Sequence, residues 1–273
     1  MGIIAEIHGK VSSSGSNIND RLEDILTSNV FQLLRYLPIE LGILPVLISA
    51  ENSHDEKQRR TFVIPTGVNI VSYYFWSRFN NWEPDVFIEL KHDEKVLANI
   101  MIEAKYLSGK SGSAVYEEDE DGNKVYVAQS DQLEKLWNSL KAYSNHVPYY
   151  LFYLTMDWVM PIQSINESIK AISDYDCRGN IYWLNWQSIH TTLNNIIVNN
   201  RTIISKADAI VIKDIINLLA KKGLKEFAGI GIHMEHKDYD LVPFNYYSLK
   251  YYDLFPSGQE FNSLKYFNGG QNG

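Results

Sequence analysis

Cysteine is nearly absent from this sequence, and its scarcity sets the first limits on function. Cys177 is the only cysteine among 273 residues, so neither an internal disulfide nor a cysteine-based zinc site can form. This usage suits a reducing cytosol, and we expect a cytoplasmic protein. Met1 to Lys10 contains two charged residues and no long apolar run, so we expect no secretory signal.

Long hydrophobic runs and an excess of positive charge are also missing. No stretch approaches the roughly 18 consecutive apolar residues of a membrane span, and we expect no membrane partner. The 25 Lys and Arg residues against 33 Asp and Glu give a formal net charge of −8. This balance excludes a polycation that holds nucleic acid by bulk charge. Contact with nucleic acid would need a local basic cluster or a metal ion.

The sequence does contain enough apolar residues for a large core. Hydrophobic residues make up 45% of the chain and charged residues 21%, which excludes a disordered or collagen-like protein. At roughly 150 residues per domain, the length allows one large domain or two modest ones. We expect a single domain, with a core over residues 1–200 and a C-terminal extension over 201–273 packed on it.

Apolar spacing predicts the order of the elements. From Leu22 onward, apolar residues recur at i, i+3, i+4 and i+7 until Pro38, which predicts an amphipathic helix that ends there. A second helix is predicted around Leu133 to Leu140. The other predicted elements are strands at 45–49, 68–75, 85–90, 98–103, 148–156 and 180–184, a hairpin at 115–127, and helices at 163–174, 187–197 and 206–221. This order predicts an α/β fold, a central mixed β-sheet flanked by α-helices.

The two strands at 85–90 and 98–103 would bring polar side chains onto one patch. The register that buries the most apolar surface has three apolar pairs on one face: Val86 with Ile102, Ile88 with Ile100 and Leu90 with Ala98. The same register places Asp85 opposite Glu103, with Cβ atoms roughly 4.5–5.5 Å apart. Lys105 lies on the face of Glu103, because side chains alternate along a strand.

Such a patch can be a catalytic metal site or an ordinary salt bridge at the edge of a sheet. Two close carboxylates repel unless a cation lies between them, and hard oxygen ligands with room for water suit Mg²⁺ better than zinc. A bound divalent ion lowers the pKa of water and neutralises charge that develops on a phosphoryl group. A lysine beside it can orient the attacking water or contact the phosphate. An isolated E-x-K tripeptide, however, is more often a salt bridge on an ordinary sheet edge.

The surrounding residues extend the pattern. Pro84-Asp85, then Glu103-Ala104-Lys105 with Glu103 18 positions after Asp85, and a preceding helix bearing Glu23 together resemble the PD-(D/E)xK nuclease superfamily over roughly residues 20–160. More closely, the sequence is similar to a bacterial branch of that family, and the segments that carry this likeness are Arg21–Phe31, Glu103–Tyr106, Ser108–Ser111 and Gln132-Leu133. The superfamily includes restriction endonucleases, resolvases and repair or phage-defence exonucleases.

The resemblance implies a restriction-endonuclease-like core and Mg²⁺-dependent hydrolysis of DNA phosphodiester bonds, in restriction, phage defence or repair. Mn²⁺ would substitute for Mg²⁺. DNA is the expected partner, and a homodimer fits because cutting two strands needs two sites.

The resemblance also assigns roles to residues. The implied metal ligands are Asp85, Glu103, Glu23 and the backbone carbonyl of Ala104. Lys105 would position or activate the attacking water. A glutamine at the start of the second helix, Gln132 in preference to Gln129, would orient Lys105 or the substrate.

Several alternatives stay open from the sequence. Glu23 and Asp20 can form an ordinary capping pair at a helix start. Lys57, Arg59, Arg60 and Lys110 can touch phosphates or remain solvated. Ser108–Ser111 matches the end of a P-loop, yet Ala104 stands where that motif requires glycine. The alternative function is a catalytically inactive binding or scaffolding module with the same fold.

Overall fold

A computed structural model describes residues 18–52, 60–79, 82–107, 112–118, 124–172, 174, 177–199 and 204–225. These all belong to one compact unit, Met1–Phe227, and a second unit, Ala228–Gly273, lies outside the described residues. The strands of the main sheet are β1 (Glu51–Asn52), β2 (Arg60–Thr61), β3 (Ile70–Phe75), β4 (Val86–His92), β5 (Lys95–Ala104), β8 (Tyr149–Thr155) and β9 (Ile181–Asn185). The described helices are α2 (Ile18–Arg35), α3 (Ile43–Ile48), α4 (Gln132–Ser144), α5 (Ile162–Ala171), α6 (Cys177–Asn180), α7 (Trp186–Asn199) and α8 (Lys206–Lys221).

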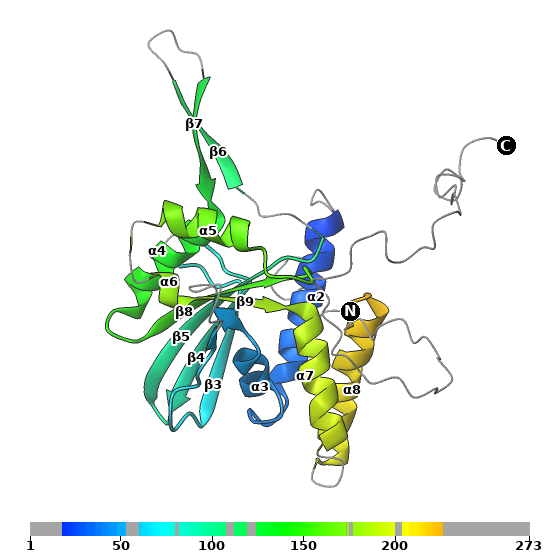
Figure 1. The fold of residues 1–273 in the computed structure, drawn as a ribbon. Coiled ribbons are helices and arrows are strands. Elements are labelled where there is room, and N and C mark those ends of the chain that lie inside the picture. The colour runs from blue at the N-terminus through cyan, green and yellow to red at the C-terminus, as the bar shows by residue number, and fades with distance from the viewer. Residues whose placement is uncertain are drawn as a thin grey trace, which may run out of the picture. The chain divides into compact units, whose positions relative to one another are not determined.

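The main sheet is mixed, and its seven strands lie in the order β2-β1-β9-β8-β5-β4-β3 (Figure 1). Strands β3, β4 and β5 form an antiparallel meander, whereas β5, β8 and β9 run parallel to one another. The carboxyl ends of these three parallel strands therefore lie at the same edge of the sheet. The predicted α/β class, with a central mixed sheet flanked by helices, is confirmed.

Helices cover both faces of this sheet. One core cluster contains Ile100, Ile102 and Phe152 together with buried residues of α2, α3, α7 and α8. The other contains Met101, Leu151 and residues of α4 and α5. Neighbouring residues of β5 thus belong to opposite clusters, as the period-two alternation of a strand requires.

The predicted register of the central hairpin is confirmed. The three expected apolar pairs are all present: Val86 with Ile102, Ile88 with Ile100 and Leu90 with Ala98. All six side chains belong to the cluster beneath α2. The turn has Asp93 with a φ of 52°, a backbone conformation in which Asp and Asn are enriched among non-glycine residues.

Two predictions made from the sequence, one at residues 45–49 and one at Gln129, are wrong. Residues 45–49 were expected to form a strand, but Ile43–Ile48 is a helix that buries Ile43, Val46 and Leu47 at helical spacing. Pro45 fits there because amide groups in the first turn of a helix have no carbonyl acceptor within the helix, so the missing amide hydrogen breaks no helical bond. Gln129 lies in a strand, β7 (Lys124–Asp131), which pairs with β6 (Gly112–Glu118) in a separate two-stranded sheet, whereas the sequence suggested a helix.

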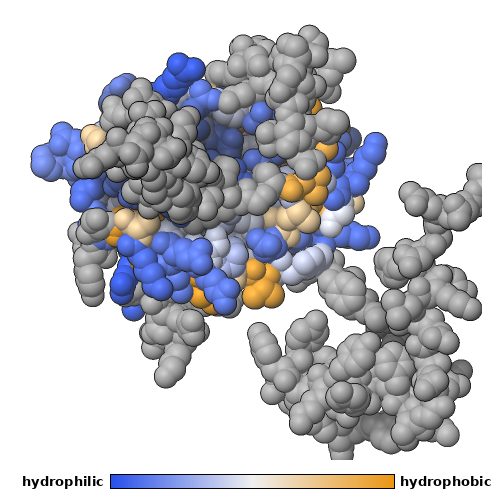
Figure 2. Space-filling model, turned by 90° about the horizontal axis from the view of Figure 1, so that it is seen from above, coloured by the Kyte–Doolittle hydropathy of each residue, from blue (hydrophilic) through white to orange (hydrophobic). Residues whose placement is uncertain are grey.

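The remaining predictions of helices and strands match the structure in type and approximate bounds. Helix α8 packs against α7 and α2, and none of the described helices is long and apolar enough to cross a membrane. On the face shown in Figure 2, the coloured surface is mostly hydrophilic with separate hydrophobic patches. Arg60 is exposed at β2, while Lys57, Arg59 and Lys110 lie outside the described residues.

Candidate functional site

The end of strand β5 holds the predicted Glu103-Ala104-Lys105 segment. Glu103 is 3% exposed and Lys105 is 8% exposed, and Ala104 between them is fully buried. The backbone continues the parallel pairing with β8, because the Lys105 amide donates to the Leu154 carbonyl at 2.7 Å. Two ionisable side chains are therefore buried at the sheet edge where the parallel strands end.

Asp85 reaches this segment from the start of β4. Its carboxylate accepts a hydrogen bond from the Ala104 amide at 2.8 Å. Backbone pairing of β4 with β5 stops at Val86 and Ile102. The bond between Asp85 and Ala104 lies just beyond this last pair and extends the hairpin. Asp85 thus lies beside Glu103, as the apolar register predicts.

Glu23 comes from α2, on the opposite face of the sheet from α4. One carboxylate oxygen lies 3.3 Å from the Lys105 ammonium, and the other accepts the Tyr106 amide at 2.8 Å. Glu23 lies five residues after the start of α2 at Ile18, beyond the first turn where a capping residue acts. Its contact with Lys105 places Glu23 in the site, and the residue is 7% exposed.

Gln132 is the first residue of α4. Its side-chain amide donates to Glu103 Oε1 at 2.6 Å, and the same oxygen lies 2.7 Å from the Lys105 ammonium. The helix start is fixed by Asp131, whose carboxylate accepts the Glu134 amide at 3.0 Å, a normal N-cap. Gln129, by contrast, belongs to β7, and its side chain lies outside the part of the chain that the structure describes.

The cluster carries more acidic groups than its single ammonium can neutralise. Burial raises the pKa of Glu103 to about 8, and the charge of Asp85 adds to this rise, while Lys105 opposes it. For Lys105, burial would lower the pKa, but the charges of Glu103, Asp85 and Glu23 outweigh that effect and raise it above its usual range. Lys105 therefore remains an ammonium at neutral pH.

The donor set suits a hard divalent cation. Three carboxyl groups, Glu23, Asp85 and Glu103, surround one ammonium, and oxygen ligands are those that Mg²⁺ prefers. The Lys105 ammonium contacts both Glu103 and Glu23 directly. Within the described ranges, no group of three or more His, Cys, Asp or Glu side chains is already arranged to hold a metal ion. A bound ion would compete with the ammonium for these carboxylates.

Two contributors to the site were missed by sequence reasoning. The Tyr106 amide orients Glu23, and the Trp186 indole donates to the Lys105 carbonyl at 3.1 Å. Trp186 is the first residue of α7 and is completely buried. No local motif identifies Trp186, because its contact with Lys105 depends on how β9 and α7 are placed relative to β5.

Comparisons with protein-family models, with curated proteins and with solved structures find no match to this chain.

Proposed function

We propose that this protein is a Mg²⁺-dependent nuclease that hydrolyses DNA phosphodiester bonds, with a restriction-endonuclease-like core. The observation that carries this proposal is the convergence of Asp85, Glu103 and Lys105 at the end of β5. Burying these groups would bring a purely structural sheet little stability, because desolvation of each buried charge costs on the order of several kcal/mol. The order of helix, three-strand meander, helix and parallel strand also supports it.

Each residue of the cluster would have a distinct task. Asp85 and Glu103 would hold Mg²⁺, with Glu23 and the Ala104 carbonyl as further ligands. When bound, the ion would lower the pKa of water and stabilise negative charge that develops on the phosphate.

Lys105 would orient the attacking water. Its ammonium has three hydrogen-bond donors, and the contacts with Glu103 and Glu23 use two of them. The third is the donor that we assign to the water or to a phosphate oxygen. Gln132 would keep the Glu103 carboxylate in a fixed orientation, because it donates to the oxygen that also contacts Lys105.

A second candidate is a binding or scaffolding module that has lost the chemistry. One observation favours it: the Lys105 ammonium already bridges Glu103 and Glu23, so these side chains hold one another in place without a metal. In that case the cluster would be a buried ion-pair network that fixes α2 against the sheet.

Supercoiled plasmid DNA distinguishes the two candidates. We expect cleavage by the wild type in Mg²⁺, no cleavage in EDTA, and none by Lys105→Ala. Lys141→Ala is the matched control, because Lys141 is an exposed lysine of α4 that pairs with Asp174 outside the cluster; it should cut like the wild type.

Cleavage that persists in EDTA or in a folded Lys105→Ala variant would reject the mechanism. Absence of cleavage on both DNA and RNA, together with absence of Mg²⁺ binding by calorimetry, would favour the scaffold.

A further inference from the structure

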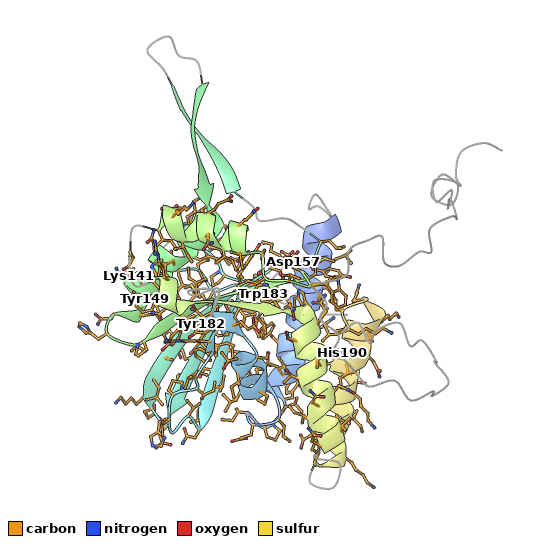
Figure 3. The ribbon with its side chains drawn as sticks, in the orientation of Figure 1. Lys141, Tyr149, Asp157, Tyr182, Trp183 and His190 are labelled. Carbon is orange, nitrogen blue, oxygen red and sulfur yellow. The ribbon has the colours of Figure 1, made fainter. Side chains whose placement is uncertain are left out.

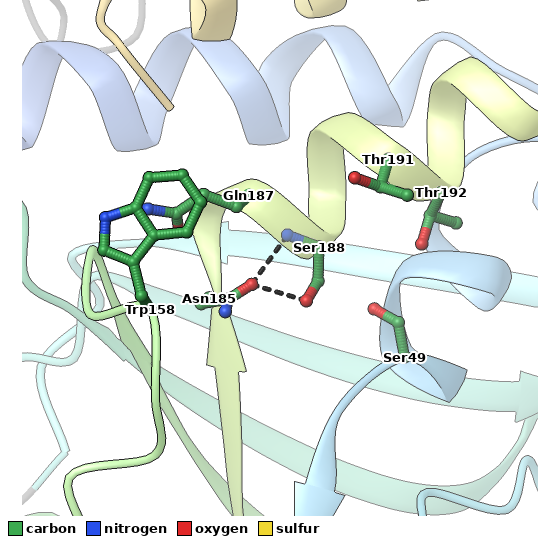
Figure 4. Close-up of a pocket in the computed structure, with 7 residues that line it drawn as sticks. All are labelled: Ser49, Trp158, Asn185, Gln187, Ser188, Thr191 and Thr192. Carbon is green, nitrogen blue, oxygen red and sulfur yellow. Dashed lines mark hydrogen bonds between the residues drawn. The ribbon is translucent and has the colours of Figure 1, made fainter. Parts of the chain in front are cut away.

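A polar pocket lies at the same sheet edge as the carboxylates, where β9 ends and α7 begins. Its volume is about 270 Å³. Figure 4 shows Trp158 and Gln187 at one end and Thr191, Thr192 and Ser49 at the other. The remaining lining residues are Asn185 and Ser188. The volume lies just below the usual range for small-molecule sites, so the pocket suits one small chemical group.

The lining is entirely uncharged. It contains one indole and otherwise only hydroxyl and amide side chains. The amide of Ser188 in the first turn of α7 is already bonded to the Asn185 side chain at 2.6 Å, so this helix start does not offer that donor to an anion. A phosphate would find no cation among the described residues that line this pocket. A neutral ligand with a ring face and polar edges fits the lining better.

Gln187 gives the pocket an unfilled hydrogen-bond requirement. The side chain is 4% exposed, and its amide nitrogen donates to the Met156 carbonyl at 2.8 Å. Its buried carbonyl oxygen has no donor among the residues that the structure describes. An unpaired buried acceptor destabilises the protein, and a ligand N–H would satisfy it.

The loop after β8 supplies an aromatic surface beside this acceptor. Met156, Trp158 and Val159 are all exposed, and Trp158 is 55% exposed. The loop is held by hydrogen bonds to Thr155: the Asp157 amide donates to its hydroxyl, and so does the Trp183 indole. Figure 3 shows Asp157 and Trp183 together near the end of β9. The exposed indole thus lies on an anchored loop.

Parallel pairing fixes how far this pocket lies from Lys105. Ala104 pairs with Leu154, and Leu154 with Leu184, so Lys105 is level with Asn185 two strands away. Two strand spacings amount to roughly 10 Å, which is about three nucleotide steps of a stacked strand. The indole of Trp186 joins the two places directly through its bond to the Lys105 carbonyl.

We propose that this pocket binds one unpaired nucleobase of the strand whose phosphodiester is cut, stacked on Trp158 with an N–H of its pairing edge donated to Gln187. Every base has a π-face, and stacking on an aromatic side chain is the usual means of holding single-stranded nucleic acid. The inference rests on the proposed nuclease function and adds a substrate class to it: DNA with unpaired nucleotides beside the cut.

The test measures binding of a short fluorescein-labelled oligothymidylate in Ca²⁺ by anisotropy, using the full chain. Trp158→Ala should weaken binding by roughly 5- to 150-fold, the range expected for loss of one base–aromatic stack, while Trp158→Phe should recover most of it. The dependence of affinity on salt should not change, because no phosphate contact is removed. Val159→Ala, an exposed residue of the same loop, should bind like the wild type.

An abasic oligomer of the same length provides the second arm. It should bind the wild type more weakly, and Trp158→Ala should cause no further loss with it. Equal binding of oligothymidylate by wild type and Trp158→Ala, or no binding at all, would overturn the base pocket.

Plasmid cleavage in Mg²⁺ separates this inference from the function on which it rests. Cleavage by the wild type, combined with unchanged oligomer binding by Trp158→Ala, rejects the pocket and leaves the nuclease standing. Weakened binding by Trp158→Ala without any cleavage by the wild type supports the pocket and rejects the nuclease.

Discussion

Lys105 holds two acidic side chains from different elements. Its ammonium lies 2.7 Å from Glu103 and 3.3 Å from Glu23, and all three side chains are buried. Removing one partner of a buried ion pair is more damaging than the net value of the pair suggests, because the remaining charges stay desolvated.

We therefore expect Lys105→Met to lower the free energy of unfolding by about 3–5 kcal/mol in EDTA. Mg²⁺ should then stabilise this variant more than the wild type, because the ion would replace the lost positive charge. Urea denaturation with and without Mg²⁺ measures both effects. Lys141→Met, at an exposed lysine, should change neither the stability nor its response to Mg²⁺. An equal response of Lys105→Met and wild type to Mg²⁺ would contradict the proposed role of the cluster as a cation site.

Glu103 should make the stability of the metal-free protein depend on pH. Its pKa in the folded state is raised to about 8 by burial and by Asp85, so the folded state retains a proton that the unfolded chain loses near pH 4.5. Stability should therefore decrease as the pH rises from about 4.5 to 8. The Glu103→Gln variant should show a smaller decrease over this range.

Denaturation at several pH values in EDTA tests this dependence. Glu167→Gln, at an exposed position of α5, is the control and should follow the wild type. A wild-type curve that rises steadily through the same range would show that Glu103 is ionised in the folded protein.

At the scale of the elements, the N-cap of α4 connects helix stability to the site. Asp131 caps the helix, and the next residue, Gln132, holds Glu103. Helix α8 offers a matched case, because Ser205 accepts the Asp208 amide at 3.1 Å in the same way. In α4, the first helical residue after the cap contacts Glu103. In α8, the corresponding residue is the exposed Lys206.

We expect Ser205→Ala to cost about 1 kcal/mol of stability, and Asp131→Ala at least as much because the Asp131 carboxylate also accepts a hydrogen bond from Ser168 at 3.1 Å. Only Asp131→Ala should also weaken Mg²⁺ binding, by roughly 10-fold or more, because residues that orient a metal ligand have effects of that size. Thermal unfolding gives the first quantity and calorimetry the second. Equal effects on Mg²⁺ binding would show that Gln132 does not depend on its helix start.

The central hairpin shows why part of the site could be predicted from sequence. Its alternate residues are strongly apolar, so only one register buries them together, and that register places Asp85 near Glu103. Residues 43–49 show the opposite case. A short apolar run contains too few polar positions to distinguish a helix from a strand, and the prediction there was wrong.

Contacts between distant elements could not be predicted in this way. The meeting of Glu23 with Lys105, and of Trp186 with the same segment, depends on how α2 and α7 lie against the sheet. Local periodicity identifies the buried face of a helix, but it does not say which strand that face covers.

At the scale of the whole molecule, α8 belongs to the same apolar core as the N-terminal helix. Ile212, Ile215 and Leu219 are fully buried in the cluster that also contains α2 residues. The position of Glu23 at the site thus depends partly on packing supplied from residues almost 200 positions later.

Two isoleucines of α8 test this dependence. Ile215→Ala should lower the free energy of unfolding by about 2–5 kcal/mol, as for other buried aliphatic truncations. Ile210→Ala, at a side chain that is 60% exposed, should change it by no more than about 0.5 kcal/mol. Chemical denaturation of both variants is sufficient, and equal effects would mean that α8 is not part of the cooperative core.

The hydrogen bond from the Trp186 indole to the Lys105 carbonyl has a consequence for the products that the proposed nuclease would release. Because it fastens the start of α7 to the end of β5, thermal fluctuations that displace the lysine also carry the wall of the pocket. The distance between a base bound in that pocket and the cleavage site would then be fixed, so fragments would end a constant number of nucleotides from the bound base.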